Sequence, residues 1–322
     1  MAILKRLKGS LAKGKSVAQT ENVATVAKRI VLSPKFEPEA FTVLDRPGPC
    51  MVCGLNAVRF KSDYPSNVKP FSEQEVLYCT NCGSGQVPGS AELLQGYYEQ
   101  DYASSNRKDR EIEPEVYFSE EYRNSSRALQ RYFGRAQRQI SVLRQHGSQV
   151  TRMLDFGSGP GYGLFLSGAQ EKFAFEPDEK SIKYLDHIKA KRFSAIGELR
   201  PSSFDAIIAS HAIEHLVPEA LIATLAILIN SLTRDGVMLI EVPQGGHSYL
   251  HLNARQDPHT LFFTPQGLSL AVELAGGEIL LQRTYGKHRV PLRKNPIYVP
   301  PDHPFYKEDR GALTVVCRRR RD

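Results

Sequence analysis

The feature that most constrains the fold is a short apolar stretch that ends in three closely spaced glycines. Residues 153–161 read MLDFGSGPG, which predicts a buried strand followed at once by a sharp turn. Glycine adopts backbone conformations that other residues avoid, and it lets the chain lie directly against a ligand. The amide groups that open the next helix then offer hydrogen bonds to a polar or anionic group. The stretch therefore indicates a ligand-binding strand, turn and helix.

Two further stretches follow the glycine turn in an order that strengthens this interpretation. Residues 173–176 read FAFE, so a second strand ends in Glu176, 21 residues after Asp155. A carboxylate at the end of the second strand is placed to accept hydrogen bonds from both hydroxyls of a ribose. Residues 203–216 read SFDAIIASHAIEHL, an apolar strand followed by the motif H-x-x-E-H-L. Together the three stretches predict a ligand site at the ends of neighbouring strands.

Strands and helices alternate from about residue 152 to residue 317, as in a parallel sheet covered by helices. A helix is expected over 119–146, with Ser119 as its N-cap. One face of this helix carries a stripe of four arginines, Arg127, Arg131, Arg135 and Arg138. Such a stripe is usually solvated, although contact with an anionic acceptor is an alternative. Strands are expected at 153–156, 173–176, 191–195, 204–210, 237–242, 277–284 and 313–317, and further helices at 180–189, 218–232 and 265–275.

These stretches resemble class I S-adenosylmethionine-dependent methyltransferases, in particular the group related to ubiquinone-type and carbohydrate methyltransferases. The resemblance covers about residues 119–317 and depends on the order and spacing of the motifs. It implies an α/β, Rossmann-like sheet of seven strands, an S-adenosylmethionine cofactor and transfer of a methyl group. A nicotinamide-binding enzyme would show G-x-G-x-x-G rather than G-x-G-x-G, and no G-x-x-x-x-G-K-[ST] motif of nucleotide triphosphatases occurs.

Carried over position by position, the resemblance assigns cofactor contacts to nine residues. The glycine turn would line the methionine portion of the cofactor, Asp155 would reach its amino-acid end, and Glu176 would bind the ribose. Ser210 or His211 would lie beside the sulfonium, and Glu198 is the nearest match to the acid on the adenine side. The nine predicted residues are Asp155, Gly157, Ser158, Gly159, Gly161, Glu176, Glu198, Ser210 and His211.

The motif H-x-x-E-H has a second interpretation, because inverted zinc proteases carry the same letters. Here the motif follows a buried strand in the order typical of methyltransferases, which disfavours a protease. A third interpretation is that His215 caps the chain or packs beneath the pocket and takes no part in chemistry.

Four cysteines form two C-x-x-C pairs, Cys50 with Cys53 and Cys79 with Cys82, and 25 residues separate the pairs. Four thiolates suit a structural Zn²⁺ that has no open position for chemistry. The pairs therefore predict a small zinc-ribbon-like module in a reducing compartment, by default the cytoplasm. Together with nearby tyrosines and a methyltransferase core, the module resembles the front part of sugar C-methyltransferases, in which it helps to close the acceptor pocket.

The net charge of +7 suggests a nucleic-acid partner, but the distribution of the charge argues otherwise. Residues 1–30 carry +6 and residues 318–322 carry +3, so the region between them carries −2. The cysteine-bearing residues 41–92 carry −1, and four thiolates around Zn²⁺ add about −2. An RNA methyltransferase that grips RNA through this module is an alternative that the charge disfavours. A non-catalytic binding protein with the cofactor fold is a second alternative.

The chain divides into five predicted segments: a basic flexible arm at 1–40, a zinc module at 41–92, a connector at 93–118, a methyltransferase domain at 119–317 and a basic tail at 318–322. The basic ends could tether the protein weakly to an anionic partner or membrane surface. No apolar run approaches the roughly 20 residues that a membrane-spanning helix needs.

The acceptor is expected beside the loop that follows the fifth strand, because ligands bind at the carboxyl ends of parallel strands. His259, in the sequence DPHTLFFTP, is the first candidate for the base that removes a proton from the acceptor, and Glu241 and His251 follow. An alternative is that His259 binds backbone groups and pins the loop. The predicted acceptor is a small polar molecule, with a hydroxyl of a sugar, nucleotide sugar or saccharide intermediate preferred.

Overall fold

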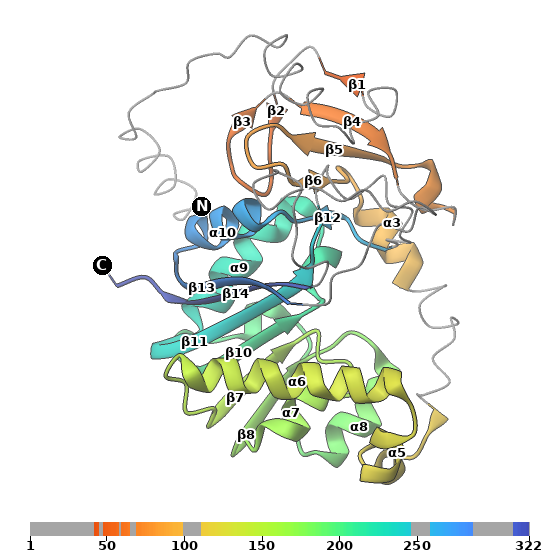
Figure 1. Cartoon of the computed structure of the whole chain (residues 1–322), viewed down its shortest axis with the longest axis vertical. Coiled ribbons are helices and arrows are strands. Elements are labelled where there is room, and N and C mark those ends of the chain that lie inside the picture. Colours follow the sequence, from red (N-terminus) through yellow and green to blue (C-terminus); the bar gives the residue numbers. More distant parts are fainter. Residues whose placement is uncertain are drawn as a thin grey trace, which may run out of the picture. The chain divides into compact units, whose positions relative to one another are not determined.

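Seven strands form the main sheet: β7 (Arg152–Phe156), β8 (Glu171–Phe175), β9 (Lys191–Phe193), β10 (Phe204–Ser210), β11 (Leu232–Pro243), β13 (Gly277–Tyr285) and β14 (Ala312–Arg319). Their order across the sheet is β13-β14-β11-β10-β7-β8-β9. The five strands from β11 to β9 run parallel, and β14 lies antiparallel between β11 and β13. The expected α/β, Rossmann-like sheet of seven strands is confirmed (Figure 1).

The computed structural model describes residues 42–44, 48–57, 59–64, 69–98, 111–245, 258–285 and 312–321. The predicted arm at 1–40 and the candidate base His251 lie outside these residues. Within the described ranges, no helix is long and apolar enough to cross a membrane.

Two layers of helices cover the sheet, and the central strands are apolar on both faces for this reason. Met153 and Ile208 face a cluster that includes α6 (Arg127–Gln145), α7 (Tyr162–Ser167) and α8 (Ile182–His187). Leu154 and Ile207 face the opposite cluster, with α9 (Leu221–Asn230) and α10 (Pro265–Leu274). Figure 1 shows the two layers on either side of the strands. The alternation explains why these strands appear in the sequence as nearly continuous apolar runs.

The prediction of one continuous helix over 119–146 is wrong, because two helices occupy this region. The first, α5 (Glu120–Asn124), has Ser119 as its N-cap, and its hydroxyl accepts a hydrogen bond from the amide of Tyr122. Ser126 then adopts an extended conformation and caps α6 through the amide of Leu129. A serine hydroxyl that satisfies a free amide favours a new helix start over continuation. Short 3-10 turns also precede α8 (η5, Glu179–Ser181) and α9 (η8, Pro218–Ala220).

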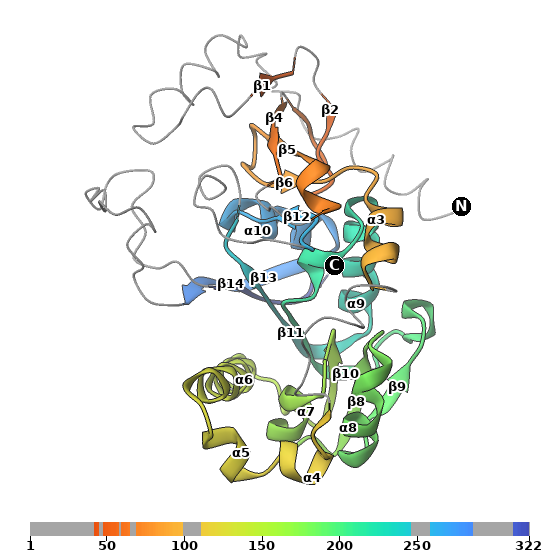
Figure 2. The same cartoon turned by 90° about the vertical axis from the view of Figure 1, so that its right-hand side faces the viewer.

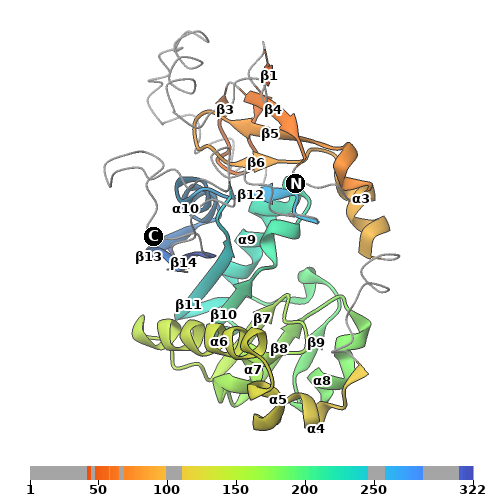
Figure 3. The same cartoon turned by 45° about the vertical axis from the view of Figure 1, so that its right-hand side comes forward.

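A second sheet forms the cysteine-bearing module, and one of its strands comes from far along the chain. Its order is β1-β4-β5-β6-β12. The strands are β1 (Thr42–Val43), β4 (Arg59–Asp63), β5 (Glu75–Cys79), β6 (Gly85–Gln86) and β12 (Leu261–Phe262), and the hairpin of β2 (Gly48–Pro49) and β3 (Asn56–Ala57) lies beside them. Because β12 pairs with β6, the sheet extends beyond the predicted limits of 41–92. Figures 2 and 3 show the module next to β12 and α10.

The predicted connector contributes two short helices, α3 (Ala91–Gly96) and α4 (Pro114–Tyr117). Tyr117 stacks on the buried Tyr162 with ring centres 4.7 Å apart, so α4 belongs to the core of the methyltransferase sheet. Tyr97 instead packs against Phe71, in the 3-10 turn η2 (Phe71–Glu73) of the module. The connector is therefore shared between the two sheets.

The first residues of the segment predicted as a basic tail at 318–322 belong to the main sheet, because β14 extends to Arg319. Arg318 lies in β14 and binds Glu278 of β13 through two hydrogen bonds of 2.9 and 2.7 Å. Arg321 pairs with Asp235 at 2.8 Å. Strand pairing and opposite charges hold these arginines against the domain, so their charge is partly neutralised.

Candidate functional site

A cavity of about 480 Å³ opens where the strand order reverses, beside the carboxyl ends of β7 and β10. Ligands bind in open α/β sheets at such a position. A small adjoining hollow of about 30 Å³ reaches Asp155 and Ser158. The residues that line the larger cavity are Tyr117, Ala128, Leu129, Tyr132, Arg135, Gly157, Gly159, Pro160, Tyr162, Glu176, Ser210, His211 and His215.

Seven of the nine predicted cofactor residues line one of these two spaces. The exceptions are Gly161, which caps α7 with φ of +85°, and Glu198. Glu198 lies in an exposed 3-10 turn, η6 (Ile196–Glu198), and accepts hydrogen bonds from Ser194 and the amide of Ala195. The part of Glu198 in adenine binding stays a prediction.

Glu176 lies directly after β8 and contacts the glycine turn. Its two carboxylate oxygens accept hydrogen bonds from the backbone amides of Gly159, at 2.5 Å, and Asp178, at 2.8 Å. The acid and the turn, 17 residues apart, therefore lie side by side as the sequence predicted. This contact fixes the carboxylate in the lining of the cavity.

Neighbouring groups lie so close to the backbone of the turn that they leave no room for a side chain. Gly157 has φ of +75°, and a Cβ at this position would lie 2.5 Å from the Cβ of Ala212. Gly163 in α7 lies outside the predicted set of site residues, yet a Cβ there would lie 2.7 Å from Oδ2 of Asp155. Contacts this short would force the neighbouring groups apart, so the two glycines let the turn pack against both strands.

Asp155 is 5% exposed at the end of β7. Burial and the nearby charge of Glu176 raise the pKa of Asp155 to about 7, because both disfavour the ionised form of its carboxyl group. A cation that binds at this point would relieve the repulsion. The arrangement suits a ligand with a positively charged group at one end and hydroxyls near Glu176.

The chain makes an unusual turn where β10 ends. Ser210 accepts a hydrogen bond from Gln139 of α6 at 2.8 Å, and the next residue, His211, has φ of +54°. The amide of His211 donates to the backbone oxygen of Glu241 at 2.7 Å. Side chains other than glycine rarely adopt this conformation, so surrounding contacts must hold it.

The buried acid of the H-x-x-E-H motif lies among three histidines, two from the motif and His259. Glu214, in η7 (Ile213–His215), is 1% exposed. Its Oε1 lies 3.3 Å from Nδ1 of His211 and 3.9 Å from Nε2 of His215, and the ring of His259 lies 4.8 Å from that of His215. Burial alone would raise the pKa of Glu214, but the adjacent Nδ1 of His211 and the charges of the three histidines lower it to about 2. The acid is therefore a carboxylate at neutral pH.

Of the three predicted bases, only His259 and Glu241 lie among the described residues. Glu241 is fully buried in β11 and accepts hydrogen bonds from Arg138 at 2.6 Å and from Thr314 at 2.9 Å. It does not line the cavity, and its partner Arg138 belongs to the stripe expected on a solvated face. Arg135 of the same stripe lines the cavity, with its guanidinium 4.9 Å from the ring centre of Tyr132.

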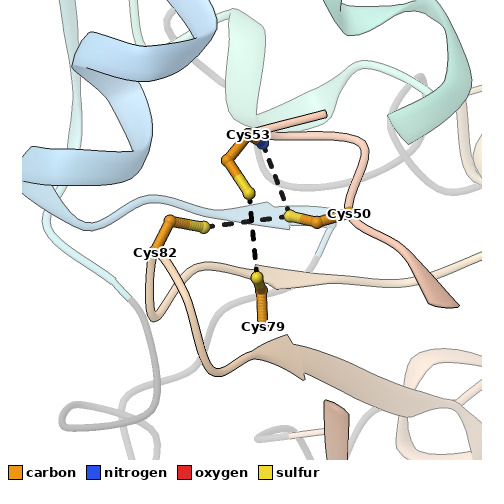
Figure 4. A group of neighbouring side chains, drawn as sticks. All are labelled: Cys50, Cys53, Cys79 and Cys82. Carbon is orange, nitrogen blue, oxygen red and sulfur yellow. Dashed lines mark hydrogen bonds between the residues drawn. The ribbon is translucent and has the colours of Figure 1, made fainter. Parts of the chain in front are cut away.

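The four paired cysteines converge in one buried cluster (Figure 4). The Sγ atoms of Cys50 and Cys82 lie 3.8 Å apart, and those of Cys53 and Cys79 lie 3.7 Å apart. Four sulfurs at about 2.3 Å from a central Zn²⁺ would be separated by about 3.8 Å in a regular tetrahedron. None of the cysteines is in a disulfide. The cluster has the size and ligand set of a tetrahedral zinc site.

The module also holds the segment that carries His259. The hydroxyl of Tyr64 donates to the backbone oxygen of His259 at 2.8 Å. The amide of Val87 donates to the oxygen of Thr260, and the amide of Thr260 donates to the oxygen of Glu214. These bonds form a chain of contacts from the module to the histidine cluster.

Comparison with known proteins identifies the family of the domain. The family model described as "Methyltransferase domain" matches residues 120–282, just over half of the chain. A search of curated proteins found no match. Among solved structures, the chain is similar to 1,6-didemethyltoxoflavin-N1-methyltransferase from Burkholderia thailandensis, with 16% identity and a TM-score of 0.45 over 73% of this chain and 95% of that one. It is also similar to an S-adenosylmethionine-dependent methyltransferase from Archaeoglobus fulgidus, with 16% identity and a TM-score of 0.44 over 57% of this chain and 93% of that one. On the family match, the chain belongs to the family of methyltransferase domains.

Proposed function

We propose that the protein transfers the methyl group of S-adenosylmethionine to a hydroxyl of a small polar acceptor, with a sugar or nucleotide sugar preferred. The observation that supports this most directly is the cavity at the switch point. Its lining combines the glycine turn and Glu176 with Arg135 and the two histidines of the H-x-x-E-H motif. Both the donor and an acceptor can therefore be bound in one place.

The residues at the cavity fit the parts of S-adenosylmethionine. Glu176 would accept hydrogen bonds from the ribose hydroxyls, and Asp155 would face the amino group, whose positive charge offsets the repulsion between the two acids. Gly157 and Gly159 leave room for the backbone to contact the ligand closely. The cofactor supplies a methyl group on a positively charged sulfur, which activates it for displacement.

The lining of the cavity carries a cation, Arg135. Arg135 lies over Tyr132 in the lining of the cavity, where a guanidinium could bind a phosphate or carboxylate of the acceptor. Alignment of the acceptor oxygen with the methyl group contributes much of the rate in such reactions. A charged acceptor, such as a nucleotide sugar, suits this position better than an apolar one.

We propose that the four cysteines hold a structural Zn²⁺. The separations between the sulfurs fit a tetrahedral site. Four thiolates complete the coordination of Zn²⁺ and leave no open position for a substrate, which supports a structural role for the metal. Thiolates stay available for a metal in a reducing compartment, so the cytoplasm remains part of the proposal. The contacts of Tyr64 and Val87 support a role for the module in holding the acceptor side, as the resemblance to sugar C-methyltransferases implies.

Calorimetric titration with S-adenosylmethionine tests the donor assignment. The wild-type protein should bind it, and Glu176→Ala should weaken binding at least tenfold because the ribose hydroxyls lose a charged acceptor. Glu179→Ala is the matched control, since Glu179 is an exposed acid three residues away. Methyl transfer to a panel of sugars and nucleotide sugars then tests the acceptor. Absence of binding by the wild type at millimolar cofactor would refute the proposal.

A further inference from the structure

Three side chains outside the cysteine cluster come together in a way that suits a metal ion. They are Glu214, His215 and His259, and one potential ligand atom of each lies within 4.8 Å of those of the other two. Oε1 of Glu214 is 3.9 Å from Nε2 of His215. The acid and the first histidine are neighbours in η7, whereas His259 follows His215 by 44 residues. The fold therefore brings together ligands that the sequence keeps apart.

Glu214 provides an independent sign of a missing positive charge. It is 1% exposed, and neither of its carboxylate oxygens accepts a hydrogen bond from the part of the chain that the structure describes. Its contact with Nδ1 of His211, at 3.3 Å, does not have the geometry of a hydrogen bond. Buried carboxylates are normally hydrogen-bonded, paired with a charge or bound to a metal. A cation between Glu214 and the histidines would supply what these oxygens lack.

The separations between the three side chains are close to those of a metal site. Nitrogen and oxygen ligands lie about 2.0–2.2 Å from an ion such as Zn²⁺, so two ligands of one ion are at most about 4.2 Å apart. The 3.9 Å between Glu214 and His215 is within this limit. The 4.8 Å that bounds the trio exceeds it by about 0.6 Å, which a small rotation of the half-buried His259 ring would remove.

Backbone contacts hold the segment of His259 opposite the acid. The amide of Thr260 donates to the backbone oxygen of Glu214 at 2.9 Å, and the hydroxyl of Thr260 donates to the backbone oxygen of Leu216. On the other side, the hydroxyl of Tyr64 donates to the backbone oxygen of His259 at 2.8 Å. The peptide unit that follows the histidine is therefore fixed at both its oxygen and its amide. Ligands held in place before an ion arrives bind it more tightly.

We propose that Glu214, His215 and His259 bind a divalent metal ion of the first transition series. Two imidazoles and one carboxylate suit Zn²⁺, Fe²⁺ or Mn²⁺, and three protein ligands leave coordination positions for water. This site differs in chemistry from the cysteine cluster, whose thiolates favour softer ions. His215 also lines the cavity, so the two sites share a residue. The proposal concerns metal binding alone and does not depend on the proposed methyl transfer.

Mn²⁺ is the probe, because it binds nitrogen and oxygen ligands but is a weaker competitor than Zn²⁺ for four thiolates. The full chain is dialysed against EDTA, and elemental analysis verifies that the cysteines keep their zinc. Electron paramagnetic resonance should then show one bound Mn²⁺ per chain. Pulsed measurements should show hyperfine coupling to the ¹⁴N of a bound imidazole. Glu214→Gln and His259→Gln should each weaken Mn²⁺ binding at least tenfold, since each removes a ligand.

Two control variants separate this site from other places where a cation could bind. His187→Gln should bind Mn²⁺ like the wild type, because His187 lies 3.5 Å from Glu115 in a pair outside the trio. Glu176→Gln should also keep the ion, since the neighbouring acids Glu176 and Asp155 are the rival cation site.

Three results would overturn the proposal. They are failure of the wild type to bind millimolar Mn²⁺, a bound Mn²⁺ without ¹⁴N coupling, and equal binding by the wild type and Glu214→Gln. Circular dichroism verifies that each variant is folded. If the buried Glu214→Gln variant does not fold, His259→Gln, which changes a half-buried side chain, gives the same test, and unweakened binding by it would overturn the proposal.

Discussion

Replacement of Arg138 by methionine should expose how strongly the core depends on one buried ion pair. Nη2 of Arg138 lies 2.6 Å from Oε2 of Glu241, whose side chain is fully buried. Thr314 donates a second hydrogen bond to the same oxygen at 2.9 Å. In Arg138→Met the carboxylate would keep the hydroxyl of Thr314 but lose its only ion-pair partner among the described residues.

Loss of one partner from a buried ion pair costs about 3–5 kcal/mol, because the remaining charge stays in the core uncompensated. The Arg138 side chain is 33% exposed, so solvent screens part of the interaction. Thr314 also still stabilises the carboxylate. We therefore expect the lower end of the range, a loss of about 3 kcal/mol in the free energy of unfolding.

Urea unfolding followed by circular dichroism measures this change. Arg131→Met is the matched control, since Arg131 is exposed on the same helix, and its free energy of unfolding should stay within about 0.5 kcal/mol of the wild type. The double variant Arg138→Met with Glu241→Met removes both charges and should recover most of the loss.

A loss below about 1 kcal/mol in Arg138→Met, or a double variant no more stable than the single one, would refute the reasoning. The double variant also tests the prediction that Glu241 is a catalytic base. If it retains methyl transfer, Glu241 serves the structure alone.

Three further predictions concern the turn, the buried acid and the metal. Gly157→Ala should lower the free energy of unfolding by about 1–3 kcal/mol in urea, because φ is +75° and Ala212 lies in the way, whereas Gly134→Ala, in an open position on α6, should raise it by up to about 1 kcal/mol. The pKa of Asp155, raised to about 7, means that the folded protein keeps a proton that the unfolded chain has lost above about pH 4, so stability falls as pH rises from about 4 to 7. Asp155→Asn should therefore be more stable than the wild type by up to about 4 kcal/mol at pH 8 and equal to it at pH 4, and equal stability at both pH values would contradict this. Cys53→Ser should lose the zinc that elemental analysis finds in the wild type, whereas Cys317→Ser, outside the cluster, should keep it.

The parallel strands were predictable because each is buried on both faces and therefore nearly continuous in apolar residues. The strand expected at 204–210 coincides with β10, and the weak one at 191–195 appears as β9, only three residues long. The link between the glycine turn and Glu176 was also predictable, since parallel neighbours end at the same edge.

Features that depend on distant contacts were not predictable from periodicity. The strand β12 has two residues and exists because β6 offers a free edge. Arg138 continues the arginine stripe of the sequence, but it forms an ion pair with Glu241, 103 residues away. The residues around Arg138 in the sequence therefore do not indicate that its side chain points inward. The spacing of His211 and Glu214 is visible in the motif, whereas the left-handed turn that faces them toward each other is not.

The pairing of β6 with β12 also sets an order of events in folding. Residues 85 and 86 are synthesised long before residues 261 and 262, with which they pair. The cysteine module therefore leaves the ribosome with an open sheet edge, and it can complete that sheet only after most of the methyltransferase domain has been made. Long-range pairing of this kind slows folding and exposes an edge strand in the meantime. A metal ion bound early by the four cysteines would hold the first half of the module together until its last strand arrives.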